Sequence, residues 1–356
     1  MASARRIGVA LQGGGAHGAF TWGVLDRLVD EVVEGRLEIA AISGTSAGAL
    51  NGAALALGLL QGPVPAREML AKLWRRNSEL SEFNPLVIQS RIMEIEERGA
   101  WNIDDSNVAS LTSLFALRFS PYDLGALYHN LLEPLIDSAL PDLDRLNGAN
   151  GPALFICATQ ISDNSRKIFR RPHITRDALL ASACLPTEFK AIEIGKERYW
   201  DGGYLGNPAL KPLFDRDETS QPVDDIIVIR TNPLLRTDGW PTSARQIADR
   251  LNEITFNAAL ILEADGICTV NKLLAHLKED SACRSKYREI RLHMIADDPL
   301  MQALGYVSKF NPYPPFLDYL HGAGRRAADT WLARHINDIG ACTTWNIDED
   351  VKKKLR

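Results

Sequence analysis

The sequence has little of what marks disulfide-rich, metal-binding, nucleic-acid-binding or membrane-spanning proteins. Its five cysteines are widely separated and form no CxxC pair and no cluster with histidine at zinc spacing. Forty Lys and Arg nearly balance 45 Asp and Glu, and the formal net charge of −5 argues against a nucleic-acid partner. The longest run of low polarity, Ala47 to Leu60, is shorter than the roughly 20 residues of a membrane-spanning helix.

A secretory signal is also missing from the N-terminus. The first residues, MASARRIGVALQGGG, reach a glycine cluster before an apolar stretch of sufficient length has formed. A cytoplasmic protein with reduced thiols is therefore expected. What the chain does have is ordinary: 46% of its 356 residues are apolar and 24% are charged, which predicts a packed globular protein.

Hydrophobic periodicity predicts an α/β protein. Arg6 to Leu11 has the pattern of a strand, and residues 20–32 carry apolar side chains at helical spacing. Ile39 to Ile42 is uniformly apolar, which is typical of a buried parallel strand, and an Ala- and Gly-rich helix follows from Ser46 to about Leu60. Later strands are expected at Ala153 to Thr159, Ser165 to Arg170, Asp225 to Arg230 and Glu289 to Ile295, and later helices at Arg245 to Leu262 and Arg325 to Asn337.

No repeat or low-complexity linker divides the chain, so residues 1–356 are predicted to form a single domain. The stretch at about 62–150 lacks a convincing strand and contains amphipathic segments, which predicts a helical insertion. This insertion could form a lid or a pocket wall, or it could only cover one face of the sheet. The proline- and aromatic-rich segment from Phe310 to Tyr319 is expected to be packed but irregular.

A first glycine-rich turn follows the first predicted strand. Residues 13–18, GGGAHG, satisfy GxGxxG between a strand and a helix, as a dinucleotide site requires. The acidic residue that such a site places after the second strand is missing, because that strand ends in SGTS. A nucleotide-binding oxidoreductase therefore remains an alternative. The same glycines can also aim unpaired N–H groups at a negative oxygen that need not belong to phosphate.

A second turn, from Gly44 to Gly48, is GxSxG placed between a buried strand and a helix, which is the context of a nucleophile elbow. Such a turn holds Ser46 in a strained conformation with its hydroxyl exposed. The alternative is a serine that merely caps the helix. If the two strands are parallel neighbours, both turns meet at one sheet edge, and N–H groups from Gly13 to Gly15 can hold the oxyanion formed when Ser46 attacks a carbonyl.

The base for this serine has two candidate sources. Asp201 and its two following glycines come directly after a strand-like segment, where the glycines would bare a carboxylate. An unperturbed Asp has a pKa of about 3.9, so a Ser/Asp pair must rely on a short hydrogen bond and on the oxyanion donors. A Ser–acid–His order offers four histidines instead, none in a recognisable turn: His276, His293, His321 and His335.

The motifs GGGAHG, GTSAG and DGG occur in this order, with Cys184-Leu185-Pro186 before the last. In this the chain resembles the patatin-like phospholipases over roughly Arg6 to Pro208. The resemblance implies a three-layer α/β/α fold with a mainly parallel central sheet. It also implies a lipid acyl hydrolase in which Ser46 is the nucleophile, forming an acyl-enzyme, and Asp201 is the proton acceptor.

The resemblance assigns roles to the surrounding glycines as well. Many members of the family carry Arg or Lys where this chain has His17, and a neutral imidazole lends less positive potential to an oxyanion. His17 could instead face solvent at the start of a helix. The implied set comprises an oxyanion hole at Gly13, Gly14, Gly15 and Gly18, a nucleophile elbow at Gly44 and Gly48, and support for Asp201 from Gly202 and Gly203.

The expected partners follow from this mechanism. They are a lipid ester as substrate and, transiently, a membrane surface, with neither metal nor cofactor because a Ser/Asp mechanism needs none. A basic run from Arg166 to Arg171 could touch anionic headgroups, but a solvated strand face is the favoured interpretation. A catalytically silent member that only binds lipid or a protein partner is the remaining alternative.

Overall fold

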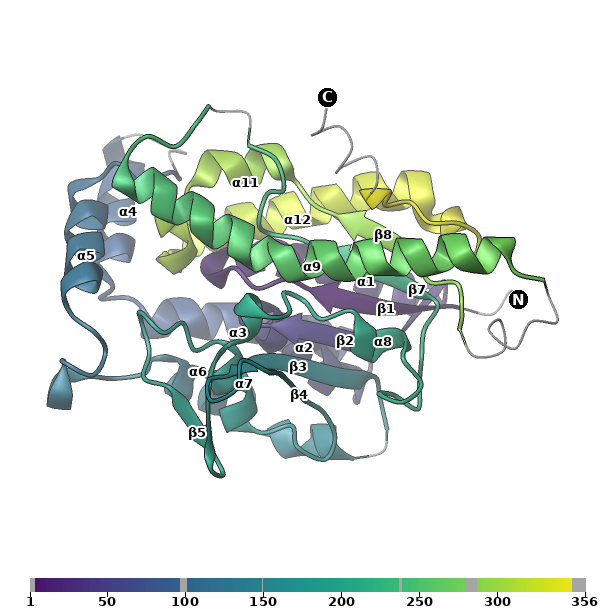
Figure 1. Ribbon diagram of the computed structural model, residues 1–356. Coiled ribbons are helices and arrows are strands. Elements are labelled where there is room, and N and C mark those ends of the chain that lie inside the picture. The colour runs from purple at the N-terminus through teal and green to yellow at the C-terminus, as the bar shows by residue number, and fades with distance from the viewer. Residues whose placement is uncertain (1–3, 97–100, 149, 237–238, 279–286, 348–356) are drawn as a thin grey trace.

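The computed structural model describes residues 4–96, 101–148, 150–236, 239–278 and 287–347. Its centre is an eight-stranded sheet with the order β5-β6-β3-β2-β1-β7-β8, in which β4 pairs with β3 (Figure 1). The ladders that join β3, β2, β1, β7 and β8 are parallel, whereas β4, β5 and β6 are added by antiparallel pairing. The strands are β1 (Arg5–Leu11), β2 (Leu37–Thr45), β3 (Ala153–Gln160), β4 (Arg166–Phe169), β5 (Ile192–Ile194), β6 (Glu197–Asp201), β7 (Asp225–Ile229) and β8 (Arg291–Ile295).

Helices cover both faces of this sheet, so the fold has three layers, α/β/α (Figure 1). The larger layer contains α1 (Gly18–Val33), α2 (Ala47–Leu59), α3 (Pro63–Leu80), α6 (Leu132–Ala139), α7 (Arg176–Ser182) and α12 (Pro314–His335). The opposite face is covered by α8 (Lys211–Phe214) and the long α9 (Ala244–His276). The described residues also form α4 (Pro85–Glu96), α5 (Asn107–Arg118) and α11 (Asp298–Leu304).

The central parallel strands are largely apolar and buried because helices cover both faces of the sheet there. Along β1, Ile7, Val9 and Leu11 join the core beneath the larger helical layer, while Ala10 belongs to the core beneath α8 and α9. The same alternation divides β7 between the two cores. Side chains that point alternately to two buried faces explain why this part of the sequence lacks the polar–apolar alternation of a half-exposed sheet.

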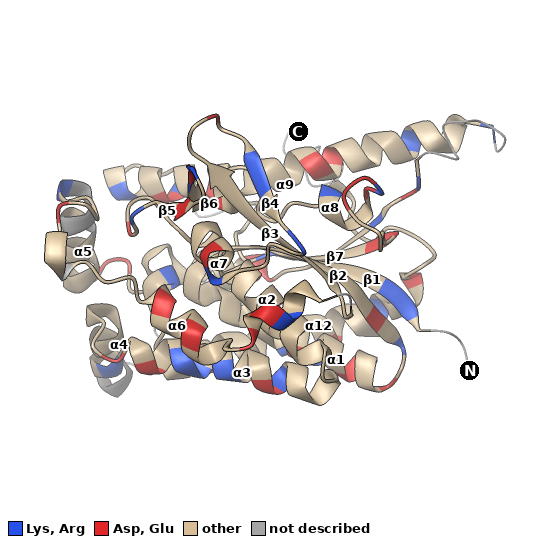
Figure 2. Cartoon of the chain, turned by 90° about the horizontal axis from the view of Figure 1, so that it is seen from below, with Lys and Arg blue, Asp and Glu red and all other residues tan. Residues whose placement is uncertain are grey.

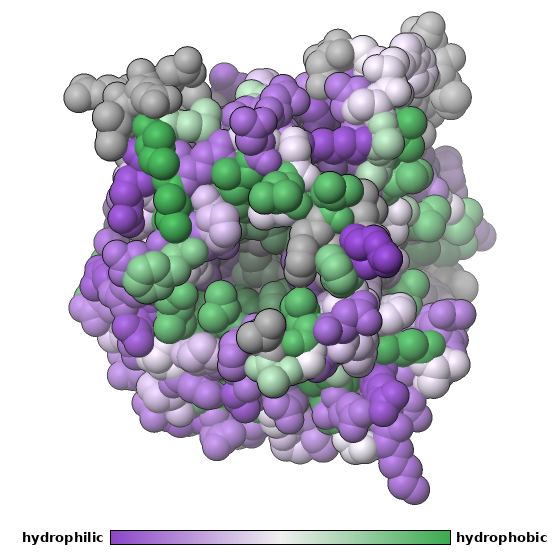
Figure 3. All heavy atoms as spheres, turned by 90° about the vertical axis from the view of Figure 1, so that its left-hand side faces the viewer, coloured by the Kyte–Doolittle hydropathy of each residue, from purple (hydrophilic) through white to green (hydrophobic). Residues whose placement is uncertain are grey.

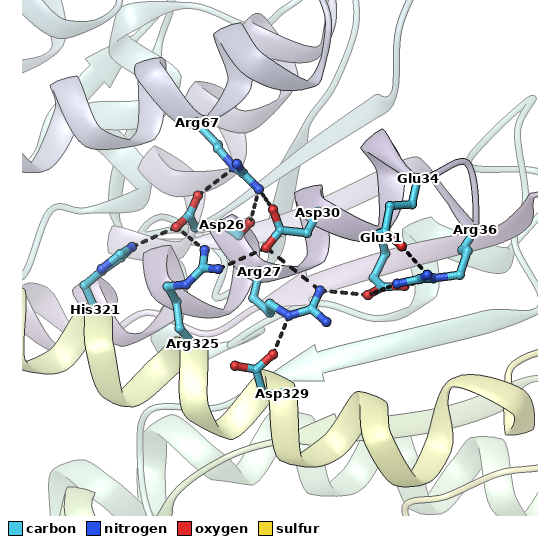
Figure 4. A network of polar contacts seen from close by, with 10 residues as sticks. All are labelled: Asp26, Arg27, Asp30, Glu31, Glu34, Arg36, Arg67, His321, Arg325 and Asp329. Carbon is cyan, nitrogen blue, oxygen red and sulfur yellow. Dashed lines mark hydrogen bonds and ion pairs between the residues drawn. The ribbon is translucent and has the colours of Figure 1, made fainter.

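The C-terminal helix α12 lies directly on α1. A Cβ at Gly23 would stand 2.0 Å from the carbonyl oxygen of His321, and one at Gly324 would stand 2.1 Å from that of Phe20, so the two backbones touch. Polar contacts then tie both neighbours of α1 to its outer face (Figure 4). Asp26 contacts His321 of α12 at 3.2 Å and Arg67 of α3 at 3.0 Å.

The fold class predicted from the sequence is confirmed, and each expected strand is present with its ends within a few residues. The expected irregular segment up to Tyr319 is wrong, because α12 begins at Pro314 rather than near Arg325. Prolines at the first helical positions are compatible with a helix, since those N–H groups have no partner within it. The described residues between 62 and 150 hold helices and no strand, as expected for this stretch.

The basic run around β4 is coloured blue in Figure 2, and its arginines make contacts within the chain. Arg166 pairs with Glu263 of α9, and Arg170 contacts Glu218 at 2.6 Å. Arg171 donates to the carbonyl of Leu146 at 2.7 Å. These arginines therefore connect the layers and loops of the fold.

Among the described residues, no helix is both long and apolar enough to cross a bilayer.

Candidate active site

The two glycine-rich turns meet at one edge of the sheet. β1 and β2 are parallel neighbours with Leu11 beside Gly44, so the segments that follow them leave the sheet at the same end. A Cβ at Gly13 would lie 2.6 Å from the Cβ of Ser46 and 2.7 Å from the carbonyl oxygen of Thr45. The first turn therefore packs directly against the serine, which requires residue 13 to have no side chain.

Ser46 occupies a strained turn between β2 and α2. Its φ of 56° and ψ of −127° place it in a region that non-glycine residues rarely adopt. The side chain makes no capping bond to the helix, so the helix-cap alternative is wrong. The backbone N–H of Ser46 donates to Oγ of Ser182 at 3.0 Å, and that hydroxyl in turn donates to the carbonyl of Cys157 at 2.6 Å.

The two glycines of the elbow allow this turn to pack without a side chain in the way. A Cβ at Gly44 would stand 2.4 Å from the carbonyl oxygen of Gly48. One at Gly48 would stand 2.1 Å from the carbonyl oxygen of Leu11. Both contacts are with backbone that cannot move aside cheaply, so the start of α2 sits against the end of β1 only because these residues are glycine.

Asp201 ends β6, which pairs antiparallel with β3 and so brings the carboxyl to the same edge. The residue is fully buried. Its Oδ1 accepts the Gly203 N–H at 2.7 Å, and its own carbonyl accepts the Thr159 hydroxyl at 2.8 Å. Gly202 and Gly203 make room for this arrangement, because a Cβ on either would stand within 2.3 Å of Cys157 or Phe256.

Burial raises the pKa of Asp201 to about 7, although the Gly203 N–H and the Ser46 hydroxyl both favour the charged form. The Ser46 hydroxyl is therefore close to this carboxyl. Oδ2 nevertheless has no hydrogen bond that meets ordinary geometric limits within the described part of the chain. A buried carboxyl oxygen without a partner, beside a serine hydroxyl, is an acceptor available for the serine proton.

The first turn offers fewer free donors than the sequence predicts. The Gly13 N–H already donates to Oδ1 of Asn207 at 2.7 Å, and the Gly18 N–H bonds within the helical turn. Within the described residues the N–H groups of Gly14 and Gly15 have no such partner. Gly15 is exposed and Gly14 half-buried, so these two groups are the ones open to an oxyanion.

His17 does not face solvent, contrary to one sequence expectation. It is 1% exposed, and its Nε2 lies 2.7 Å from Oγ of Ser308. Burial and, second, the charge of Lys309 lower the pKa of His17 to about 3, so the ring is neutral at physiological pH. A buried ring at this position is favoured in its uncharged form, because the free energy of desolvating an imidazolium would exceed the stabilisation that neighbouring groups provide.

The four histidines that the sequence offered as a base lie elsewhere in the structure. His293 bonds Thr344 and Asp225, and His321 contacts Asp26. His335 contacts Asp338, while His276 is the last residue of α9. In the described ranges no group of three or more His, Cys, Asp and Glu residues is arranged to hold a metal ion. A Ser–His triad is therefore not formed by the residues that the sequence offered for it.

The residues that brace the site from a distance carry no signal in the sequence. Ser182 anchors the elbow, Asn207 occupies the Gly13 N–H, and Asn232 and Lys309 lie behind the first turn. None stands in a motif, and each reaches its partner across tens to hundreds of positions. Only the topology of the sheet brings them together.

Apolar side chains gather round a hollow at the end of the molecule that carries α4 and α5 (Figure 3). This end is also where α9 begins (Figure 1). We call the exposed apolar residues of α4, α5 and the first part of α9 the apolar rim. They are Ile88 and Ile92 of α4, Leu111 and Leu114 of α5, and Ile247, Leu251 and Ile254 of α9. Exposed apolar side chains gathered round a hollow are typical of a site that receives an apolar partner.

The fold and the site define an α/β/α protein that carries a serine on a sharp strand-to-helix turn, next to a buried carboxyl. A family model described as patatin-like phospholipase matches residues 9–214, more than half of the chain, and the chain belongs to that family. Its members are lipid acyl hydrolases.

The crystal structure of VipD from Legionella pneumophila matches with a TM-score of 0.34 and 16% sequence identity, covering 92% of this chain and 67% of that one. A comparison with curated proteins finds no match.

Proposed function

We propose that this protein hydrolyses lipid esters with Ser46 as nucleophile and Asp201 as general base. One observation carries the proposal: a fully buried carboxyl oxygen without a hydrogen-bond partner in the described chain lies beside the hydroxyl of a serine held in a strained turn. The pKa of about 7 for Asp201 removes the objection that an ordinary aspartate is too weak a base.

In the acylation step Asp201 accepts the Ser46 hydroxyl proton while Oγ attacks the ester carbonyl carbon. The carbonyl electrons move to oxygen, and the resulting oxyanion accepts hydrogen bonds from the N–H groups of Gly14 and Gly15. Collapse of this intermediate re-forms the carbonyl and breaks the bond to the alcohol oxygen. The alcohol leaves with the proton from Asp201, and the acyl group stays on Ser46.

Water completes the cycle through the same groups. Asp201 accepts a proton from water as the water oxygen attacks the acyl carbon, and the same two N–H groups hold the second oxyanion. Its collapse releases the carboxylic acid and returns the proton to Ser46 Oγ. Every proton thus moves between Asp201 and an oxygen atom. A carboxyl with a pKa of about 7 can both accept and donate a proton near neutral pH.

A lipid is the substrate class that the surroundings favour. The apolar rim provides exposed aliphatic surface at the end of the molecule where the helical insertion lies, and acyl chains would be drawn to it by the hydrophobic effect. The rim contributes no charge of its own. We therefore assign it to the acyl chains or to the lipid surface rather than to the headgroup.

Labelling with a fluorophosphonate probe, located by mass spectrometry, tests this function together with hydrolysis of a short-chain chromogenic ester and of phospholipid vesicles. Ser46 should carry the label, and S46A and D201N should lose at least about 10³-fold in turnover while remaining folded. The exposed D217N variant is the matched control. Hydrolysis retained in S46A, or a label on another serine, overturns the assignment. An unlabelled, inactive wild type would instead indicate a silent lipid-binding member.

We also infer that the chain works as one domain. One sheet contains both β1, which starts at Arg5, and β8, which ends at Ile295. The residues that contact the first turn from behind come from positions 231 to 309. Limited proteolysis of the purified protein should release no stable fragment that retains esterase activity. An active proteolytic fragment lacking β7 and β8 would contradict this view.

A further inference from the structure

The peptide group between Gly13 and Gly14 is fixed by two side chains that follow β7. Its carbonyl oxygen, on Gly13, accepts the Thr231 hydroxyl at 3.1 Å and Nδ2 of Asn232 at 3.0 Å. A trans peptide is planar, so its C=O and N–H point in opposite directions. Fixing the Gly13 carbonyl therefore fixes the direction of the Gly14 N–H, one of the two free donors of the turn.

Asn232 is itself fixed by a cation. Nζ of Lys309 donates to Oδ1 of Asn232 at 2.6 Å, so the amide oxygen faces the ammonium and the amide nitrogen faces Gly13. The backbone N–H of Asn232 donates to Oε1 of Gln12 at 2.8 Å, which ties the residue to the end of β1. The Asn232 side chain consequently has one orientation, and it connects the ammonium to the peptide.

The element that carries Lys309 also touches the turn directly. Lys309 belongs to the short 3₁₀ helix η5 (Val307–Phe310), which precedes α12. A Cβ at Gly15, where φ is +57°, would stand 2.3 Å from the Lys309 carbonyl oxygen. Ser308 of the same turn contacts the His17 ring at 2.7 Å. The oxyanion turn and η5 therefore form one packed unit.

We propose that Lys309 and Asn232 are positioning residues that orient and polarise the Gly13–Gly14 peptide, so that the Gly14 N–H becomes a stronger donor to the oxyanion. The inference rests on the proposed function and extends it. Hydrogen bonds arranged in a chain polarise one another, and a charged donor at the start of the chain strengthens those that follow. Lys309 thus supplies at a distance the positive potential that the neutral His17 does not.

The charge state of Lys309 is set by several elements. Burial lowers its pKa to about 8, while the nearby carboxylates act in the opposite direction, so the ammonium is mostly charged at neutral pH and lost above pH 8. His17 stays neutral and does not compete for the role. The charged groups that act on Lys309 are Glu253 and Asp249 of α9, Asp104 before α5, and Arg236 after β7.

Three substitutions at residue 309 separate charge from packing, measured with a short-chain soluble ester so that lipid binding plays no part. Lys309→Met removes both the donor and the charge and should lower kcat by about 10- to 100-fold with KM little changed. Lys309→Gln keeps a donor without charge and should fall between Met and wild type. Lys309→Arg keeps the charge and should restore most of kcat.

The pH dependence of activity distinguishes a positioning role of Lys309 from a purely structural one, since a structural role would not change it. The wild type should lose activity as pH rises past about 8, where Lys309 loses its proton. Lys309→Arg should shift this loss to higher pH, and Lys309→Gln should abolish it. Asn232→Ala combined with Lys309→Met should cost little more than either alone, because both act through one peptide.

Lys167→Met, on the exposed side of β4, is the control. A folded Lys309→Met protein with kcat within twofold of wild type overturns the proposal, as does an alkaline limb that Lys309→Arg leaves in place. If Lys309→Met does not fold, the Gln and Arg variants still decide the question. An inactive wild type would refute the proposed function instead, so the two failures are distinguishable.

Discussion

Gly13 lies so close to Ser46 that a methyl group on residue 13 would stand 2.6 Å from the Cβ of the serine. This contact joins two motifs that are 33 positions apart in the chain. It places the candidate nucleophile and the candidate oxyanion donors within one small volume. The contact also makes the site sensitive to the smallest possible substitution.

The Gly13→Ala substitution should therefore remove most activity. The added methyl meets the Ser46 side chain and the Thr45 carbonyl, and relieving the clash must displace the elbow. We expect a loss of about 10²-fold or more in kcat/KM and a destabilisation of about 1–3 kcal/mol. Esterase kinetics and urea denaturation measure the two effects.

Gly266→Ala is the matched control, since a Cβ there meets nothing within 4 Å. The residue lies inside α9, where alanine is the better helix former, so this variant should be as active as wild type and slightly more stable. Equal behaviour of the two alanine variants would show that the close approach at Gly13 has no functional meaning.

Replacing Asp201 by asparagine should stabilise the protein while it abolishes hydrolysis. The folded-state pKa of about 7 lies above the unfolded value of about 3.9. Between these values the unfolded chain releases the proton more readily than the folded one, so Asp201 lowers stability as pH rises from 4 to 7. Asparagine removes that penalty and keeps an acceptor for the Gly203 N–H.

Denaturation at pH 4 and pH 7.5 measures the free energy of unfolding of D201N and of the wild type. The difference between the two proteins should grow with pH and reach a few kcal/mol, on the order that linkage gives for a pKa shift of this size. The exposed D217N variant should show no such gap. A D201N protein less stable than wild type at pH 7.5 would mean that the carboxylate is satisfied in the folded state.

The pH dependence of kcat/KM should reflect the same group. Asp201 acts as a base only when it is ionised, so below pH 7 the logarithm of kcat/KM should rise by about one for each pH unit. It should level off above pH 7, until Lys309 begins to lose its proton near pH 8. An inflection near pH 4 would indicate an ordinary exposed carboxylate instead. The profile is best recorded with a neutral soluble ester, whose own charge does not change.

The apolar rim should matter for aggregated lipid and not for soluble ester. The double variant L111D/L114D places two charges on α5 and should reduce hydrolysis of phospholipid vesicles by about tenfold or more, since burying unpaired charge in lipid is costly. Hydrolysis of a short-chain ester should be unchanged. Leu262→Asp, equally exposed on α9 but outside the rim, should leave both reactions as they are.

Local patterns predicted much of this architecture. The uniformly apolar segments are buried parallel strands because helices cover both faces, and the positions of GGGAHG and GTSAG follow from the parallel pairing of β1 with β2. Asp201 was found because its glycines mark a turn. Its raised pKa could not be read from the sequence, since burial depends on the packing of distant segments.

The bracing residues escaped prediction for the same reason. Asn232 and Lys309 are 77 positions apart, and nothing near either of them in the sequence indicates an ammonium–amide contact. The sequence allowed a solvent-facing His17 because histidine is often partly exposed, yet Ser308 of η5 contacts its ring. In each case the deciding partner arrives from the C-terminal part of the chain.

β1 has a second neighbour besides β2, and that neighbour lies beyond the region that defines the family. β7 pairs with the other side of β1 in register from Ile7 to Leu11, although the matched region stops at residue 214. A chain cut at that point would keep Ser46, Asp201 and the glycines of the candidate site. It would leave β1 with an unpaired row of amide and carbonyl groups, ready to pair with another molecule. Engineers seeking a minimal version should expect aggregation unless residues 225–229 are kept.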